Sequence, residues 1–198
     1  MHPRQEEGTL VRDGYTLFPK ELSLAAYKYI FVNSNKIFRA YAITIGVTIV
    51  GTALHLILSS MLAYPLSLKK LPGRNFFSFF VFFTMLFNGG LVPTYMMYSG
   101  TFHIKNTIFA MIVPGFLMSA VNVLLIRTYF SNNIPEALYE AAEVDGAGHF
   151  TVFTKIVLPL GKPILVTVGL FAGLGYWNDW TNGLYYISDP DLLSLIHI

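Results

Sequence analysis

The chain has 198 residues, of which 54% are hydrophobic and only 12% are charged. Soluble domains usually carry about 25% charged residues, so this composition excludes an ordinary soluble domain and indicates a chain largely surrounded by lipid. The formal net charge of +2 is too small to indicate a nucleic-acid partner. The absence of cysteine excludes disulfides and thiolate metal sites, and we expect no metal site of any kind.

The first 22 residues are polar and lack the apolar centre of a signal peptide. We expect residues 1–38 to form an extracytoplasmic N-terminal segment and residues 39–198 to form a transmembrane domain.

Four apolar stretches are long enough to cross a bilayer, which needs about 20 apolar residues per helix. They span roughly residues 40–66, 76–98, 107–130 and 158–177. Small residues recur in them, as transmembrane helices that pack closely require. A soluble helical bundle would need more polar surface than these stretches leave. The predicted fold is therefore all-α, a polytopic transmembrane helix bundle with about four spans.

The short, basic loop 67–74 sets the predicted orientation, because the positive-inside rule weighs short loops most. It places 67–74 in the cytoplasm, 99–105 outside and 131–157 in the cytoplasm again.

Polar residues within the spans are the first candidate site residues. His55 lies deep in the first span, where a neutral histidine that is hydrogen-bonded to a neighbour is the favoured interpretation. The spans contain no acidic residue that could form a proton relay with it. A proton-coupled transporter would be expected to place aspartate or glutamate there.

A break in the second span is predicted by its glycines and proline, and broken helices often mark binding sites in transporters. The break either lies on a substrate path or is a packing kink. In the third span, a serine and an asparagine could bond a sugar hydroxyl or a neighbouring helix. The candidate path or gate residues are Asn88, Gly89, Gly90, Pro93, Ser119 and Asn122.

The stretch 133–157 is predicted to form two short helices. Asn133 can cap the first helix and Gly146 can end it. Helical periodicity places Ile134, Leu138, Ala141, Ala142 and Asp145 on one face. It places Glu136, Tyr139, Glu140 and Glu143 on the other. From periodicity alone, an amphipathic connector is the simplest interpretation.

The spacing within this stretch resembles the EAA motif of ATP-binding-cassette (ABC) importer permeases. The motif specifies seven positions over twenty residues, and all seven are present: Glu140, Ala141, Ala142, Gly146, Ile156, Leu158 and Pro159. The resemblance implies a cytoplasmic coupling loop that docks on a separate ATPase. It also implies that Glu140 helps to hold the docked loop and that the two alanines permit close approach. Gly146, next to Asp145, would make the turn, and the last three residues would join the loop to the following span.

Other stretches, such as AYPLSLKKLPGR and YWNDWTNGLYYI, look like the carbohydrate-uptake type of these permeases, in particular those of oligosaccharide importers of Gram-positive bacteria. Members of that family have six spans. The family's first span is missing before residue 1, and the last residues depart from the family pattern. The resemblance thus implies a fragment that retains about four of the six spans.

This resemblance implies a permease subunit that moves an oligosaccharide across the cytoplasmic membrane and has no catalytic residues or cofactor of its own. ATP would be bound by the partner ATPase, and a second permease and an extracellular solute-binding protein would complete the system. An ATP-independent secondary transporter or channel is the alternative function, and a structural membrane subunit is a third.

Overall fold

The computed structural model describes residues 34–87, 89–189 and 192, and all regular structure in these ranges is helical. The chain divides into two compact units, Met1–Asn35 and Lys36–Ile198, and the fold below is that of the second unit. Residues 1–33 of the predicted extracytoplasmic segment lie outside the described residues, so the placement of that segment stays a prediction.

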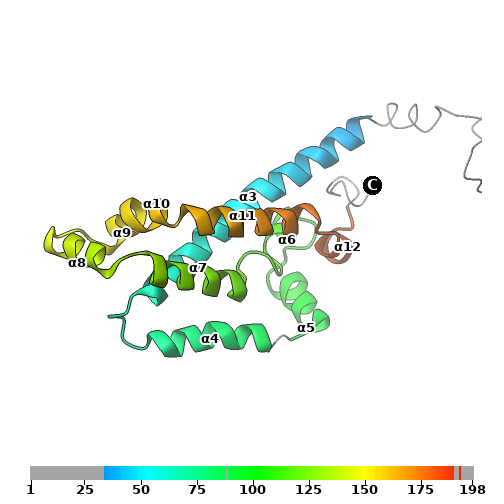
Figure 1. Ribbon diagram of the computed structural model, residues 1–198. Coiled ribbons are helices and arrows are strands. Elements are labelled where there is room, and N and C mark those ends of the chain that lie inside the picture. The colour runs from blue at the N-terminus through cyan, green and yellow to red at the C-terminus, as the bar shows by residue number, and fades with distance from the viewer. Residues whose placement is uncertain (1–33, 88, 190–191, 193–198) are drawn as a thin grey trace, which may run out of the picture. The chain divides into compact units, whose positions relative to one another are not determined.

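The first span is one long helix, α3 (Ser34–Ser67, 34 residues), which contains the predicted stretch 40–66 (Figure 1). At 1.5 Å per residue it is about 50 Å long, which exceeds the thickness of a bilayer core. Large apolar side chains such as Ile49 are exposed, whereas Gly51 and Ala63 are buried. At these positions small residues face neighbouring helices, and a bulky one is left for lipid.

The second apolar segment is broken, as its glycines and proline predict. It forms α4 (Arg74–Leu86), α5 (Leu91–Met96) and a single π-helical turn, η1 (Met97–Thr101). Gly90 has φ 84°, a left-handed value that glycine adopts at little cost. None of the residues of phenylalanine-rich α4 is buried, which suits a helix surrounded by lipid.

The third apolar segment is not one helix, so the prediction of a continuous span over 107–130 is wrong. It forms α6 (Phe109–Ile112) and α7 (Ala120–Asn133), joined by non-helical backbone. Pro114 has no N–H to continue a helix, and Gly115 has φ 78°. The proline and the glycine together account for the break.

The remaining helices run from the predicted coupling loop into the last span: α8 (Glu136–Val144), α9 (His149–Val152), η2 (Phe153–Val157), α10 (Leu158–Leu160), α11 (Lys162–Trp177) and α12 (Thr181–Tyr186). The chain bends by 79° between α10 and α11. Among the described residues, α3 alone is long and apolar enough to cross a membrane by itself. The number rises to three if each of two bent helix pairs counts as one span.

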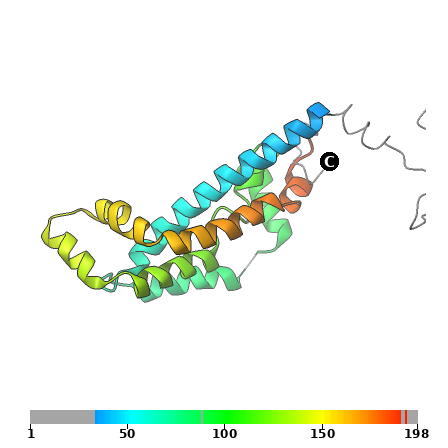
Figure 2. The same ribbon diagram turned by 45° about the horizontal axis from the view of Figure 1, so that its top comes forward.

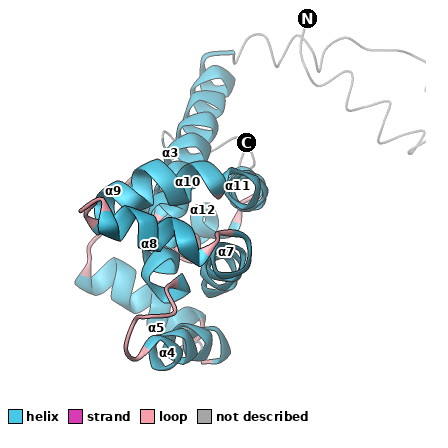
Figure 3. Ribbon diagram, turned by 60° about the vertical axis from the view of Figure 1, so that its left-hand side comes forward, coloured by secondary structure: helices cyan, strands magenta, loops and turns pink. Residues whose placement is uncertain are grey.

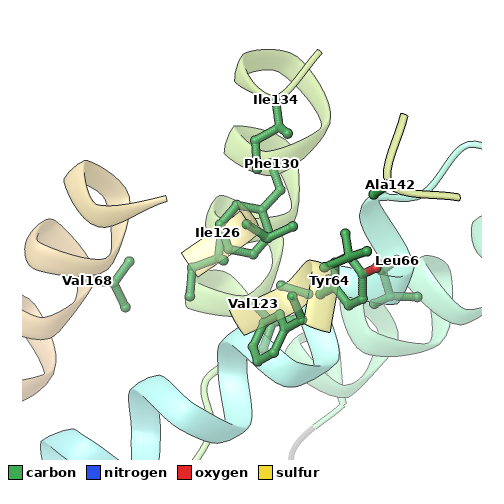
Figure 4. Close-up of a cluster of buried hydrophobic side chains, with 12 residues drawn as sticks. Tyr64, Leu66, Val123, Ile126, Phe130, Ile134, Ala142 and Val168 are labelled. Carbon is green, nitrogen blue, oxygen red and sulfur yellow. The ribbon is translucent and has the colours of Figure 1, made fainter. Parts of the chain in front are cut away.

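In the bundle, α11 lies along α3, and α7 packs between α11 and α4 (Figure 2). Helices α8, α9 and α10 lie together at one end (Figure 3). The core at this end includes Tyr64, Ile126, Phe130, Ala142 and Val168 (Figure 4). A second buried cluster consists of Val47, Ala110, Met111, Ile112, Tyr176, Tyr186 and Ile187. The predicted coupling loop is therefore attached to the bundle through a continuous apolar core.

Candidate functional site: the 131–157 loop and the bundle interior

Helix α8 begins later than the sequence predicts. The residue before its first turn is Pro135, and no side chain caps the helix. Asn133, predicted to be the cap, belongs to α7, where its Nδ2 donates to the Tyr129 carbonyl at 3.1 Å. The prediction of an Asn133 cap is wrong because the fixed φ of Pro135 starts the new helix two residues further on.

The two adjacent alanines of the EAA motif point in different directions. Ala142 is only 6% exposed and joins the core beside Val152 and Phe153, whereas Ala141 is exposed. Tyr139 is half-buried, with its ring centroid 6.5 Å from that of Tyr64. The predicted faces are therefore wrong, since Tyr139 lies inward with Ala142 and Asp145 is exposed.

The acidic residues of α8 lie against the basic loop that follows α3. Lys69 Nζ donates to Glu136 Oε2 at 2.9 Å, and Lys70 Nζ lies 3.5 Å from Glu143 Oε2 and 3.9 Å from Glu140 Oε1. The hydrogen bond from Lys69, with its positive charge, lowers the pKa of Glu136. The sequence signal for this contact was the placement of both loops on the same side of the membrane.

The side of α8 that its own chain leaves uncovered is largely apolar. Leu138 and Ala141 are exposed there, and Val144 is 87% exposed. Just beyond the following turn, Phe150 is also exposed. These four residues are called the α8 surface below. Exposed apolar side chains that gather beside polar residues are typical of a protein–protein contact.

Gly146 makes the turn at the end of α8, as predicted. Its φ is 71°, its N–H donates to the Glu143 carbonyl, and the N–H of Ala147 donates to the Ala142 carbonyl at 2.9 Å. These two bonds define a Schellman motif, in which glycine is favoured because the left-handed conformation costs it little. The turn therefore depends on the backbone freedom of this one residue.

The last three motif residues lie where the loop meets the final span. Ile156 and Leu158 are partly buried and pack against the core, and Pro159 is an exposed residue of α10. Phe153, one turn before Ile156, is buried with its ring centroid 5.3 Å from that of Tyr64. The second half of the loop is thus packed against α3.

The break in the second segment places Gly89, Gly90 and Pro93 at the exposed junction of α4 and α5. Thr94 Oγ1 donates to the Gly90 carbonyl at 2.6 Å and holds the first turn of α5. Asn88 lies outside the described residues. A role for this junction on a substrate path stays a prediction.

The break in the third segment is held by side chains from three other helices. His55 Nδ1 donates to the Phe116 carbonyl at 2.7 Å, Asn182 Nδ2 to that of Pro114 at 2.8 Å, and Tyr176 Oη to that of Ile112 at 3.0 Å. Non-helical backbone at membrane depth is tolerated where protein groups satisfy it. The sequence does not reveal this set, because its members are more than 60 residues from the carbonyls that they contact.

The Asn122 amide donates to His55 Nε2 at 2.9 Å. Because a carbonyl can only accept, Nδ1 of His55 is the donor in its bond to Phe116. The predicted hydrogen bonding of His55 to a neighbour is confirmed, and its neutral state stays a prediction. Of the two roles left open for Asn122, the structure shows the bond to a neighbouring helix. Ser119 directly precedes α7 and makes no side-chain capping bond.

Residues 56–197 match the family described as binding-protein-dependent transport system inner membrane component. The chain belongs to this family. This confirms the predicted resemblance to ABC importer permeases, and the protein is a multi-pass protein of the cytoplasmic membrane.

Individual relatives agree with this assignment. The chain is 37% identical over 183 residues to Protein LplC of Bacillus subtilis (strain 168). The aligned region covers 92% of this chain and 61% of that protein. The chain is also 37% identical over 180 residues to the polygalacturonan/rhamnogalacturonan transport system permease protein YtcP of the same organism, covering 91% and 62%. The chain thus spans less than two thirds of the length of these relatives.

A solved structure agrees with the fold. It is a crystal structure of a bacterial ABC transporter involved in the import of the acidic polysaccharide alginate. The TM-score is 0.82 at 30% sequence identity, covering 95% of this chain and 66% of that chain.

Proposed function

We propose that this protein is the membrane-spanning permease subunit of an ABC importer that carries an oligosaccharide across the cytoplasmic membrane. Family membership supports the class of transporter. The carbohydrate substrate is supported by the similarity to YtcP, a polygalacturonan/rhamnogalacturonan transport system permease protein, and to a transporter involved in the import of the acidic polysaccharide alginate. The partners in this proposal are a separate ATPase that binds ATP, a second permease and an extracellular solute-binding protein.

The observation that carries the coupling role is the α8 surface. One side of α8 packs into the core, a second side is occupied by Lys69 and Lys70, and the side with Ala141 and Val144 is left uncovered. We infer that the ATPase docks there, because small and apolar side chains allow a partner to approach closely. The remaining motif residues, Ile156 to Pro159, would transmit movement of the loop to α11.

Glu140 has a different proposed role from the one that the family resemblance implies. It lies 3.9 Å from Lys70, on the side of α8 that faces the 67–73 loop. We propose that it helps to hold α8 against its own chain, together with Glu136 and Glu143. Asp145 is exposed just before the turn, and we propose that it faces the docked ATPase.

The experiment compares two adjacent residues of the same type. Because the sequence contains no cysteine, Ala141→Cys and Ala142→Cys each introduce a single thiol that can carry a photoactivatable maleimide cross-linker. The protein is purified with the subunits that accompany it, labelled and irradiated. We expect Cys at 141 to give a product with the ATPase and Cys at 142, which is buried, to give little.

Two outcomes would contradict the proposal. If an ATPase co-purifies but position 141 gives no product, then α8 is not the contact. If no ATPase co-purifies at all, the importer assignment fails and an ATP-independent transporter is favoured.

A further inference from the structure

Two arginines at the α8 end of the bundle lack the ion pairs that the nearby lysines have. Lys69 and Lys70 are balanced by the glutamates of α8. Arg74, the first residue of α4, and Arg127, in α7, are both partly exposed, and neither forms an ion pair within the part of the chain that the structure describes. Their positive charge is therefore available to an anion from outside the chain.

Arg74 and Arg127 belong to two helices, α4 and α7, that pack against each other. Arg127 Nε donates to the Leu66 carbonyl at 3.1 Å, which fixes the guanidinium beside the end of α3. The Arg74 N–H donates to the Leu71 carbonyl at 3.4 Å. The positive charges of Arg74 and Arg127 repel each other. A single anion that contacts both would relieve this repulsion.

An apolar groove of about 450 Å³ lies beside them, between the end of α3, α4 and α7. Leu66, whose carbonyl accepts from Arg127 Nε, and Leu71, whose carbonyl accepts from the Arg74 backbone N–H, both line this groove. Each arginine is therefore bonded to a residue of the groove lining. Other lining residues are Leu62, Phe77, Phe80 and Val123. The hydroxyl of Thr84, also in the lining, donates to the Val81 carbonyl of its own helix at 2.7 Å.

We propose that this groove binds an anionic phospholipid. One acyl chain lies in the groove, and the phosphate lies between Arg74 and Arg127. Arginine suits this role because its planar guanidinium forms paired hydrogen bonds with phosphate oxygens. Basic pockets between transmembrane helices are known to favour anionic head groups.

Charge complementarity favours this occupant over the alternatives. An apolar helix of another subunit would fill the groove but leave two cations unneutralised. A free phosphate would neutralise the cations but leave the groove empty. A lipid with a negative head group satisfies both features, and α4, with none of its residues buried, is already a helix suited to lipid contact.

The test is native mass spectrometry of the protein purified with all its subunits and titrated with lipid. The probes are dioleoyl phosphatidylglycerol, dioleoyl phosphatidylcholine and glycerol 3-phosphate. We expect phosphatidylglycerol to be retained preferentially and to withstand competition by glycerol 3-phosphate. Each of Arg74→Gln and Arg127→Gln should lower its retention about fivefold, from the ~1 kcal/mol typical of a basic residue at a membrane surface.

Two further variants separate charge from shape. Lys155→Gln/Lys162→Gln removes two exposed cations from η2 and α11, neither of which contributes a residue to the groove lining, and should leave retention unchanged. Thr84→Trp fills the groove without changing any charge and should weaken retention of phosphatidylglycerol.

Five results would overturn the proposal. Equal retention of the two lipids, or an equal loss in the lysine control, would reduce the effect to general electrostatics. Displacement by glycerol 3-phosphate would identify a free-phosphate site. Full retention in Thr84→Trp would show that the groove holds no acyl chain. A cross-link from Thr84→Cys to another subunit would show that protein fills the groove.

Discussion

Substitution of His55 by leucine tests whether side-chain hydrogen bonds hold the broken third segment. His55 is 2% exposed and makes two bonds, to the Phe116 carbonyl at 2.7 Å and to the Asn122 amide at 2.9 Å. Leucine is similar in size, so the main effect is to leave a partly buried carbonyl and a partly buried amide without these partners. Each such group costs about 1–3 kcal/mol in a protein interior.

Polar bonds within bilayers are weaker on average, at roughly 0.6 kcal/mol. Two bonds at this average give about 1.2 kcal/mol, so we expect His55→Leu to lower the free energy of unfolding by about 1–4 kcal/mol. The measurement is reversible unfolding of the purified protein in mixed micelles as the fraction of denaturing detergent is raised.

A double-mutant cycle assigns the effect to the proposed bond. Asn122→Leu removes the same bond from the other side, so the double variant should cost less than the sum of the two single variants by about 0.5–2 kcal/mol. Thr128→Val is the control, because this exposed hydroxyl bonds only the Leu124 carbonyl of its own helix. We expect the control to stay within about 0.5 kcal/mol of the parent protein. The reasoning would be refuted if His55→Leu left the free energy of unfolding unchanged, or if the effects of His55→Leu and Asn122→Leu were strictly additive.

Three further predictions follow from the geometry. Gly51→Ala would place a Cβ 2.6 Å from the tyrosine ring of α11 and should destabilise the protein by about 1–3 kcal/mol. Gly46→Ala, on the same helix with nothing within 4 Å, should be neutral or stabilising, and equal unfolding curves for the two would contradict this packing. Gly146→Ala, at φ 71°, should impair transport by strain of about 1–2 kcal/mol in the turn. Gly148→Ala, at φ −67°, should not, and equal uptake rates would refute a special role for the turn. Because the pKa of Glu136 is lowered on folding, its pair with lysine stabilises the protein above the ordinary value of 4.5 and is lost as pH falls through the folded value. Thermal melting between pH 6 and 3 should therefore show an acid-dependent component that Glu136→Gln removes, and an unchanged profile in that variant would count against the pair.

The sequence by itself determined the membrane class, the family and the turn at Gly146. Long apolar stretches can be recognised without tertiary structure because the bilayer sets their length. The motif from Glu140 to Pro159 has a fixed spacing along the chain, and a left-handed turn requires glycine locally. These features depend on neighbouring residues, so they can be read from linear order.

Tertiary structure decided which way the side chains point and where the third segment breaks. Periodicity grouped Tyr139 with the glutamates. In the structure, Tyr139 packs beside the ring of Tyr64 in the core. The glutamates lie on another side of α8, where they pair with Lys69 and Lys70. The sequence left open whether Asn122 bonds a sugar or a neighbouring helix. The structure shows its amide 2.9 Å from His55 Nε2 on α3. Pro114 and Gly115 permit a break, but only distant donors make it stable at membrane depth. Contacts between residues more than 60 positions apart, such as these, leave no periodic signal in the sequence.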